Sequence, residues 1–473
     1  MIPSLLLFAA ALQGEIPVTT KSTEAAAAFR AGREKALNFQ NVEAAELFRK
    51  ALAADPDFPL ALAWSGKIAP GPQGLAQVER AVSLAGPLSP AERKSIEAIL
   101  AERKGEDEKV RLLKREIADL APNDWLAQLQ LGVQSFYDHK SQATILYLNK
   151  AIKLNPSAAE AYNYLGYVLA QQGQYDDGIK AVRKFVELKP LEPNSYDSLG
   201  EVLLLAGRYD QAESAFARSA EMAPDNWMSW IGVAYARFLR GNFAGGRESA
   251  AAARKYVTRA PDKLAIDLTL AWSWLAEGNA EAALKEIDAI EAQARKTDFD
   301  YAWAAFERAE MLHEAGREVE ATKQLEQARL RGSKGTLTGA EQNRLRRAGL
   351  VLQARIGAAS SKPRDAEQAL AALDGDLKAA PSNADLRGMV HYAKGLVALS
   401  HGDPRQAIES FKLCPETDYD CRRDLISAQQ QAGQAAAAAE TRSRLLRANA
   451  RDNIHRGADP AYLFVSSRLK ARK

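Results

Sequence analysis

The sequence predicts an all-α protein built from stacked pairs of helices. Residues 125–226 form three consecutive segments of 34 residues with matching landmarks, and Pro122, Pro156, Pro190 and Pro224 recur at that spacing. A fixed period of this length is typical of a repeat architecture. The chain also lacks stretches in which apolar and polar residues alternate, so no strands are expected.

Each 34-residue unit predicts two helices. In the second unit, apolar residues recur in steps of three and four over 161–169, which is the pattern of one helical face. Gly173 should end that helix, because glycine tolerates the left-handed conformation of a helix end. The second helix should span 175–188, and Pro190 cannot continue it. One helix pair cannot bury its own apolar face, so neighbouring units must stack.

Small residues and prolines recur at fixed places in these units. Gly132, Gly166 and Gly200 lie in the middle of first helices, where glycine costs roughly 0.5–1 kcal/mol relative to alanine. We expect this cost where a paired helix passes too close for a side chain. The structural positions of the repeat are predicted as Gly132, Gly166, Gly200, Ala212, Phe216, Pro156, Pro190 and Pro224.

These landmarks resemble the tetratricopeptide repeat: a large residue, Leu-Gly, a tyrosine, a small residue, an aromatic residue, another small residue and a proline. The resemblance covers about residues 24–450 and is specific over 125–260. It implies an α-solenoid in the form of a right-handed superhelix. It also implies that the protein binds another protein or a peptide in its concave groove.

The N-terminal region, residues 1–20, differs in composition from the rest. An apolar run over 5–12 ends in small residues, which resembles a secretory signal peptide with cleavage within 11–14. The run is too short to span a bilayer. No Lys or Arg precedes the run, so the alternative is an N-terminal helix that packs on the first repeat.

The remaining chain divides by the regularity of its repeats. Residues 24–260 form a regular array, in which 59–90 is degenerate and Ser89, Pro90 and Glu92 mark a capped helix start. Residues 261–450 form a degenerate array with glycine turns at Gly278 and Gly316. Residues 451–473 are a basic tail, whose apolar patch at 462–465 should cap the last repeat. We expect roughly eleven helix pairs.

Composition excludes several functional classes. The formal net charge is only +3 for 473 residues, which favours no general attraction to nucleic acid. Five scattered histidines and no nucleotide, hydrolase or metalloprotease motif predict no metal, no cofactor, no small-molecule substrate and no catalytic residue. Carboxylates are expected on solvated helix faces, and so is the basic stretch over 329–355.

The two cysteines, Cys414 and Cys421, lie in a turn between predicted helices. In an exported protein, a disulfide across this turn is expected. Free thiols are the alternative in a cytosolic protein. Their spacing does not match a zinc site.

The resemblance places ligand contacts on the first helices of the repeats. It implies an aromatic and amide-rich groove with an acidic patch at Asp197 and Glu201, and the same aromatic side chains could instead fill gaps between repeats. The basic clamp that some members use for a carboxylate is missing from the mapped positions. The implied groove residues are Leu129, Val133, Phe136, Tyr137, Asn163, Tyr164, Tyr167, Asn194, Asp197, Glu201, Tyr235 and Phe238.

The leading hypothesis is a non-catalytic scaffold that binds a protein or peptide in the bacterial cell envelope. The bacterial source rests on the signal-like N-terminus and a composition rich in alanine and arginine. A cytosolic regulatory or sensor module is the alternative, and it predicts an uncleaved N-terminus and free thiols. A third class is an enzyme with a site that carries no recognised motif, and tight binding of zinc or a nucleotide to the purified chain would favour it. The oligomeric state is left open.

Overall fold

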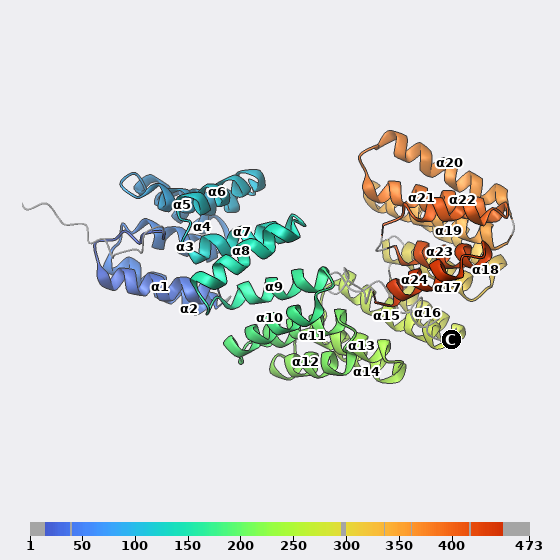
Figure 1. Ribbon diagram of the computed structural model, residues 1–473, viewed down its shortest axis with the longest axis horizontal. Helices are drawn as coiled ribbons and strands as arrows, with labels where there is room; N and C mark the ends of the chain where they lie inside the picture. Colours follow the sequence, from blue (N-terminus) through green and yellow to red (C-terminus); the bar gives the residue numbers. More distant parts are fainter. Residues whose placement is uncertain are drawn as a thin grey trace, which may run out of the picture. The chain divides into compact units, whose positions relative to one another are not determined.

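The protein is all-α, as its repeats predicted. A computed structural model describes residues 15–37, 40–294, 299–334, 336–360, 362–415 and 418–447. In these ranges the chain forms 24 helices and no strand, and consecutive helices pair along the chain (Figure 1). Twelve pairs result, one more than expected. The apolar N-terminal run, its cleavage region and the tail with its patch at 462–465 lie outside the described residues.

Contacts divide the chain into two compact units, residues 1–189 and 190–473. This division lies within the regular array and not near residue 260, where the register of the repeats loosens. The helices of the first unit are α1 (Thr23–Leu37), α2 (Asn41–Ala54), α3 (Pro59–Ile68), α4 (Gly71–Leu84), α5 (Pro90–Lys104), α6 (Asp107–Leu120), α7 (Trp125–Tyr137), α8 (Ser141–Leu154), α9 (Ala159–Gln171) and α10 (Tyr175–Leu188).

The second unit contains the other fourteen helices of the described chain. They include the long helix α19, which contains Gly357 in its last turn. In order they are α11 (Pro193–Leu205), α12 (Tyr209–Met222), α13 (Trp227–Leu239), α14 (Phe243–Arg254), α15 (Ala260–Glu277), α16 (Ala280–Gln293), α17 (Phe299–Glu314), α18 (Glu318–Lys334), α19 (Gly339–Ala359), α20 (Pro363–Ala379), α21 (Ala384–Ser400), α22 (Pro404–Phe411), α23 (Tyr419–Gln431) and α24 (Ala435–Arg447).

Local sequence sets the helix ends as predicted. Gly173, Gly278 and Gly316 all have positive φ, between 75° and 99°, directly after first helices. At the start of α5, the Ser89 hydroxyl accepts from the Glu92 amide while the Glu92 carboxylate accepts from the Ser89 amide. This reciprocal capping box satisfies two amides that the helix leaves unpaired.

The mid-helix glycines lie where paired helices touch. A Cβ built on Gly132 would lie 2.7 Å from Leu148, and one built on Gly166 would lie 2.1 Å from Val182. The residue that fills each space comes from the second helix of the same repeat. The predicted reason for these glycines, close approach of the paired helix, is confirmed.

The core of the first unit is aromatic at its beginning. Phe29, Phe48 and Phe58 are fully buried, and the rings of Phe29 and Phe58 meet edge to face with centroids 5.2 Å apart.

No helix in the described ranges is long and apolar enough to cross a membrane.

Candidate functional site

An irregular segment at the start of the first unit lies across three repeats. We call residues 15–21 the N-terminal strap. The Ile16 amide donates to Asp124 Oδ2 at 3.2 Å, and the Thr19 amide donates to Glu92 Oε1 at 2.8 Å. The Lys21 amide donates to the third acceptor, Asp55 Oδ2, at 3.0 Å.

The three acceptors lie near the starts of three first helices, although at different positions relative to each helix. Asp124 is the N-cap of α7, Glu92 lies in the first turn of α5, and Asp55 follows α2 just before α3. All three carboxylates are buried. The strap therefore crosses the starts of first helices, and each repeat offers one carboxylate to it.

A cavity of about 330 Å³ lies in the same unit. Its walls come from α1, α7 and the turn before α9, and they include Arg30, Arg33, Trp125, Leu129 and Glu160. A smaller cavity beside it is also lined by Arg33, together with Ile16 of the strap. The larger cavity combines an indole, an aliphatic wall and basic side chains.

The charge of this cavity depends on buried groups. Arg33 makes no hydrogen bond or ion pair with any described residue. Burial lowers the pKa of its guanidinium, while Asp124 and Glu15 act to raise it. Burial raises the pKa of the Glu160 carboxyl to about 7, against the opposing charge of Lys189. Near neutral pH, Glu160 is therefore only partly ionised, and the cavity wall carries a net positive charge.

Four of the predicted groove residues gather on α7 and α9. The rings of Phe136 and Tyr164 lie 5.4 Å apart, and those of Phe136 and Tyr167 lie 6.4 Å apart. The Tyr137 and Tyr164 hydroxyls are 3.4 Å apart, and Tyr137 is 67% exposed. Burial, followed by this hydrogen bond, raises the pKa of Tyr164. The patch presents aromatic edges and hydroxyls to solvent.

Three further groove candidates belong to the first unit. Val133 and Asn163 are half-buried, and the Asn163 side-chain oxygen has no hydrogen-bond partner among the described residues. Leu129 is buried but lines the larger cavity.

The candidates in the second unit differ in exposure. Asn194 is exposed, and Asp197 is half-buried and accepts from the Ser229 hydroxyl at 2.6 Å. Glu201, Tyr235 and Phe238 are buried. Phe238 packs on Gly246, where a Cβ would lie 2.4 Å from its ring. Packing thus occupies these buried side chains, and their contact with a ligand stays a prediction.

A buried ionic cluster connects α17, α19 and α23 in the second unit. Arg355 of α19 donates to Glu310 of α17 at 2.7 Å and also pairs with Glu314. Arg423 of α23 reaches Glu314 at 2.8 Å. Asp420 lies 3.5 Å from Arg355. Side chains from three first helices therefore meet inside the unit.

Carboxylates in this cluster outnumber the arginines, and their pKa values diverge. Burial raises the pKa of Glu310 to about 8, although Arg355 acts to lower it. Burial would also raise that of Glu314, but Arg423 and Arg355 hold its pKa at about 2. The expectation that carboxylates and the 329–355 arginines lie on solvated faces is wrong here, because Arg355 is only 4% exposed.

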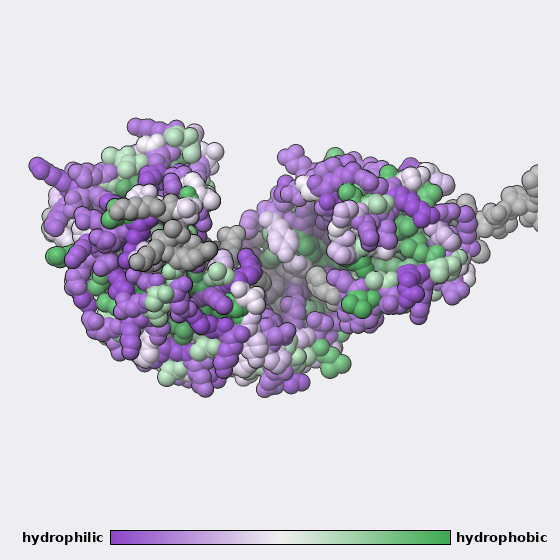
Figure 2. Space-filling model, turned by 180° about the vertical axis from the view of Figure 1, so that it is seen from behind, coloured by the Kyte–Doolittle hydropathy of each residue, from purple (hydrophilic) through white to green (hydrophobic). Residues whose placement is uncertain are grey.

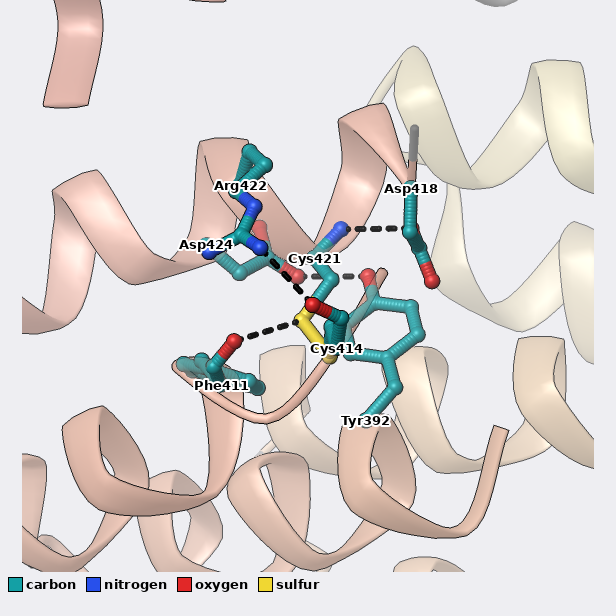
Figure 3. Close-up of a disulfide and its surroundings, with 7 residues drawn as sticks. All are labelled: Tyr392, Phe411, Cys414, Asp418, Cys421, Arg422 and Asp424. Atoms are coloured by element: carbon teal, nitrogen blue, oxygen red, sulfur yellow. Dashed lines mark hydrogen bonds between the residues drawn. A yellow bond between two sulfur atoms is a disulfide. The ribbon is translucent and has the colours of Figure 1, made fainter. Parts of the chain in front are cut away.

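Cys414 and Cys421 form a disulfide in the structure (Figure 3). The Arg422 guanidinium donates to the Cys414 carbonyl at 2.7 Å, and Asp418 Oδ1 accepts from the Cys421 amide at 2.9 Å. Asp418 lies close enough to both sulfurs to suggest a metal site. The disulfide leaves no thiolate for a metal.

On the face shown in Figure 2, hydrophilic residues predominate and hydrophobic residues form small groups.

Sequence reasoning missed the most distinctive feature of the first unit. Groove positions were mapped only from residue 125 onward, so Arg30 and Arg33 on α1 were left out. The signal that could have found the strap is the presence of one acidic residue near the start of each of three first helices: Asp55, Glu92 and Asp124.

Comparison with protein-family models and with curated proteins tests the resemblance to the tetratricopeptide repeat. Residues 141–193 and 198–263 match the family model of the tetratricopeptide repeat. A comparison with curated proteins found no match.

Among solved structures, PilW, titled a widely conserved type IV pilus biogenesis factor, is 18% identical with a TM-score of 0.38, covering 43% of this chain and 93% of that one. YrrB, titled a TPR protein with an unusual peptide-binding site, is 18% identical with a TM-score of 0.31. The match covers 38% of this chain and 92% of YrrB. PilF of Pseudomonas aeruginosa is 14% identical with a TM-score of 0.35. The match covers 45% of this chain and 94% of PilF. The matched stretches, with their landmark glycines, prolines and paired helices, identify the repeats within residues 141–263 as tetratricopeptide repeats.

Proposed function

We propose that this protein is a non-catalytic scaffold that binds a protein or peptide segment on the first helices of its first unit. One observation carries the proposal: the chain's own strap already lies on this surface and is held there through its backbone amides. A surface that holds one irregular segment through its backbone has acceptors suited to another, because every peptide offers the same amides.

The adjoining cavity supplies side-chain specificity. Trp125 and Leu129 offer apolar area, and Arg33 offers a guanidinium that no described residue pairs. A buried aromatic or arginine in a pocket typically contributes most of the binding energy at an interface. The ligand that fits is a peptide with a carboxylate beside an apolar side chain. We assign the ligand to the first unit, because its surface holds the strap and adjoins the larger cavity.

The test is selection of peptides from a displayed random library on the full-length chain. Selected peptides should be enriched in Asp or Glu next to an apolar residue. Their affinity for Arg33→Glu should fall at least about tenfold, the loss of one close charged contact. Arg49→Glu is the control, because Arg49 is exposed on the second helix α2 and, among the described residues, pairs only with Glu46. Selection of no peptide, or equal binding by Arg33→Glu, would reject the proposal.

We further propose that the protein acts in the bacterial cell envelope, with a cytosolic regulatory module as the alternative. The signal-like N-terminus and the Cys414–Cys421 disulfide support export, because disulfides persist in oxidising compartments. Intact mass of the native protein, alkylated with and without prior reduction, tests this. A chain that starts near residue 14 with protected cysteines supports export. A full-length chain with two free thiols supports the cytosolic module.

A further inference from the structure

The strap makes side-chain contacts with the first unit in addition to its backbone hydrogen bonds. Besides its three backbone amides, the Thr19 hydroxyl donates to Glu92 Oε2 at 3.1 Å and the Thr20 hydroxyl to Asp55 Oδ2 at 2.5 Å. Val18, between these contacts, is only 7% exposed and belongs to the core of the unit. The strap therefore has backbone contacts, two specific hydroxyl contacts and one apolar anchor, which are the parts of a bound peptide.

Two of the three acceptors are held in place by groups other than the strap. Asp124 Oδ1 accepts from the Ala127 amide at 2.9 Å, and Glu92 Oε2 accepts from the Ser89 amide at 3.0 Å. These two carboxylates are held by the helices that they cap. Asp55 differs, because its carboxylate hydrogen bonds with described residues come from the strap alone. The surface is thus largely preorganised for an occupant.

The acidic end of the strap lies near Arg33. Ile16 lines the smaller cavity together with Arg33, and the Glu15 carboxylate is one of the charges that act on this guanidinium. The strap therefore places a negative charge near the guanidinium that the proposed ligand would use.

We propose that residues 15–21 are a ligand in cis, which occupies the recognition track formed by Asp55, Glu92, Asp124 and Arg33. The partner is a protein with an extended segment of the same chemistry: a carboxylate, an apolar anchor and two adjacent hydroxyl residues. It binds by displacing the strap. This inference rests on the proposed function and adds the class of ligand and the way in which access is regulated.

The tether determines how strongly the strap competes. A segment joined through a short linker acts at an effective concentration on the order of millimolar. A free peptide of the same sequence with an intrinsic Kd of about 10 μM would then bind the intact chain about a hundredfold more weakly than it binds a chain whose strap is released.

The test uses a fluorescein-labelled peptide with the sequence of residues 15–21 and measures anisotropy with full-length chains. Val18→Asp should release the strap, because it would bury an unpaired charge, and this variant should bind the peptide at least tenfold more tightly than the wild type. Val42→Asp is the control, since Val42 is 79% exposed on α2, and it should bind like the wild type. Adding Asp55→Ala to Val18→Asp should remove most of the gain.

Thr19→Ala with Thr20→Ala is the milder strap variant if Val18→Asp does not fold, and it should show the same direction of change. Equal peptide binding by wild type and folded strap variants, or no binding by either, would overturn the inference.

Amide hydrogen exchange of residues 16–21 separates this inference from the proposed function. If library-selected peptides bind the wild type and these amides stay protected, the function stands and displacement fails. If the released chain binds the strap peptide but no library peptide is selected, the cis ligand stands and the broader function fails.

Discussion

Replacing Gly200 by alanine should destabilise the second unit, although alanine is the better helix former. The new Cβ would lie 2.7 Å from the Phe216 ring, about 0.7 Å inside the 3.4 Å at which ordinary contact begins. Phe216 is buried, and a Cβ on Gly232 of α13 would lie 2.4 Å from the same ring. The ring is therefore enclosed on two sides and cannot retreat toward α13.

Overpacking of this kind costs roughly 1–3 kcal/mol, and the gain from replacing glycine in a helix is roughly 0.5–1 kcal/mol. We expect a net loss of about 0.5–2 kcal/mol for Gly200→Ala, and more for Gly200→Leu. Gly375→Ala is the matched control, because Gly375 lies in α20 with nothing within 4 Å of its built Cβ. It should gain about 0.5–1 kcal/mol.

The assay is urea unfolding followed by circular dichroism, with amide exchange of α11–α13 to locate the change. Phe216→Leu shortens the opposing side chain, so the double variant should be less unstable than the sum of the single changes. The expected coupling is roughly 0.5–3 kcal/mol. Additive effects, or a Gly200→Ala protein as stable as the wild type, would refute the enclosed ring.

Three further predictions concern the charged and covalent links of the second unit. Arg355→Met should cost about 3–5 kcal/mol in urea unfolding, because it removes the arginine partner of the buried Glu310; a loss below about 1 kcal/mol would contradict the cluster. The pKa of Glu310 is about 8 in the folded chain and near its ordinary value of 4.5 in the unfolded chain. The protonated carboxyl therefore stabilises the folded chain fully below pH 4.5, and this stabilisation is lost as the pH rises to 8. The unfolding free energy of wild type should therefore fall relative to that of Glu310→Gln over this range, and a constant difference would contradict it. Cys414→Ser with Cys421→Ser should cost about 2–3 kcal/mol by removing a short loop closure, measured as the thermal shift against wild type, and identical melting curves would argue against the disulfide.

Much of the fold could be predicted because its causes are local. Gly173 ends a helix through its own backbone freedom, and the Ser89–Glu92 capping box forms within four residues. The period of 34 residues predicts that equivalent residues face equivalent neighbours. Gly166 and Val182 illustrate this, since their contact lies within one repeat.

The candidate site could be predicted only in part. Phe136, Tyr164 and Tyr167 come together because adjacent repeats place the same helical face side by side. Arg355 was misjudged as a solvated residue, since one side chain's burial depends on Glu310 and Glu314 more than forty residues away. No local pattern carries that information.

The sequence by itself determined the helix pairs, their turns and the 34-residue period of the repeats, because glycine and proline set helix ends within a few residues and the period is read directly from the chain. Tertiary structure decided which charges are buried and where an irregular segment lies. Ile16 reaches Asp124 across 108 positions of the chain. Such contacts depend on how successive repeats stack, because stacking alone brings the starts of distant helices under one segment.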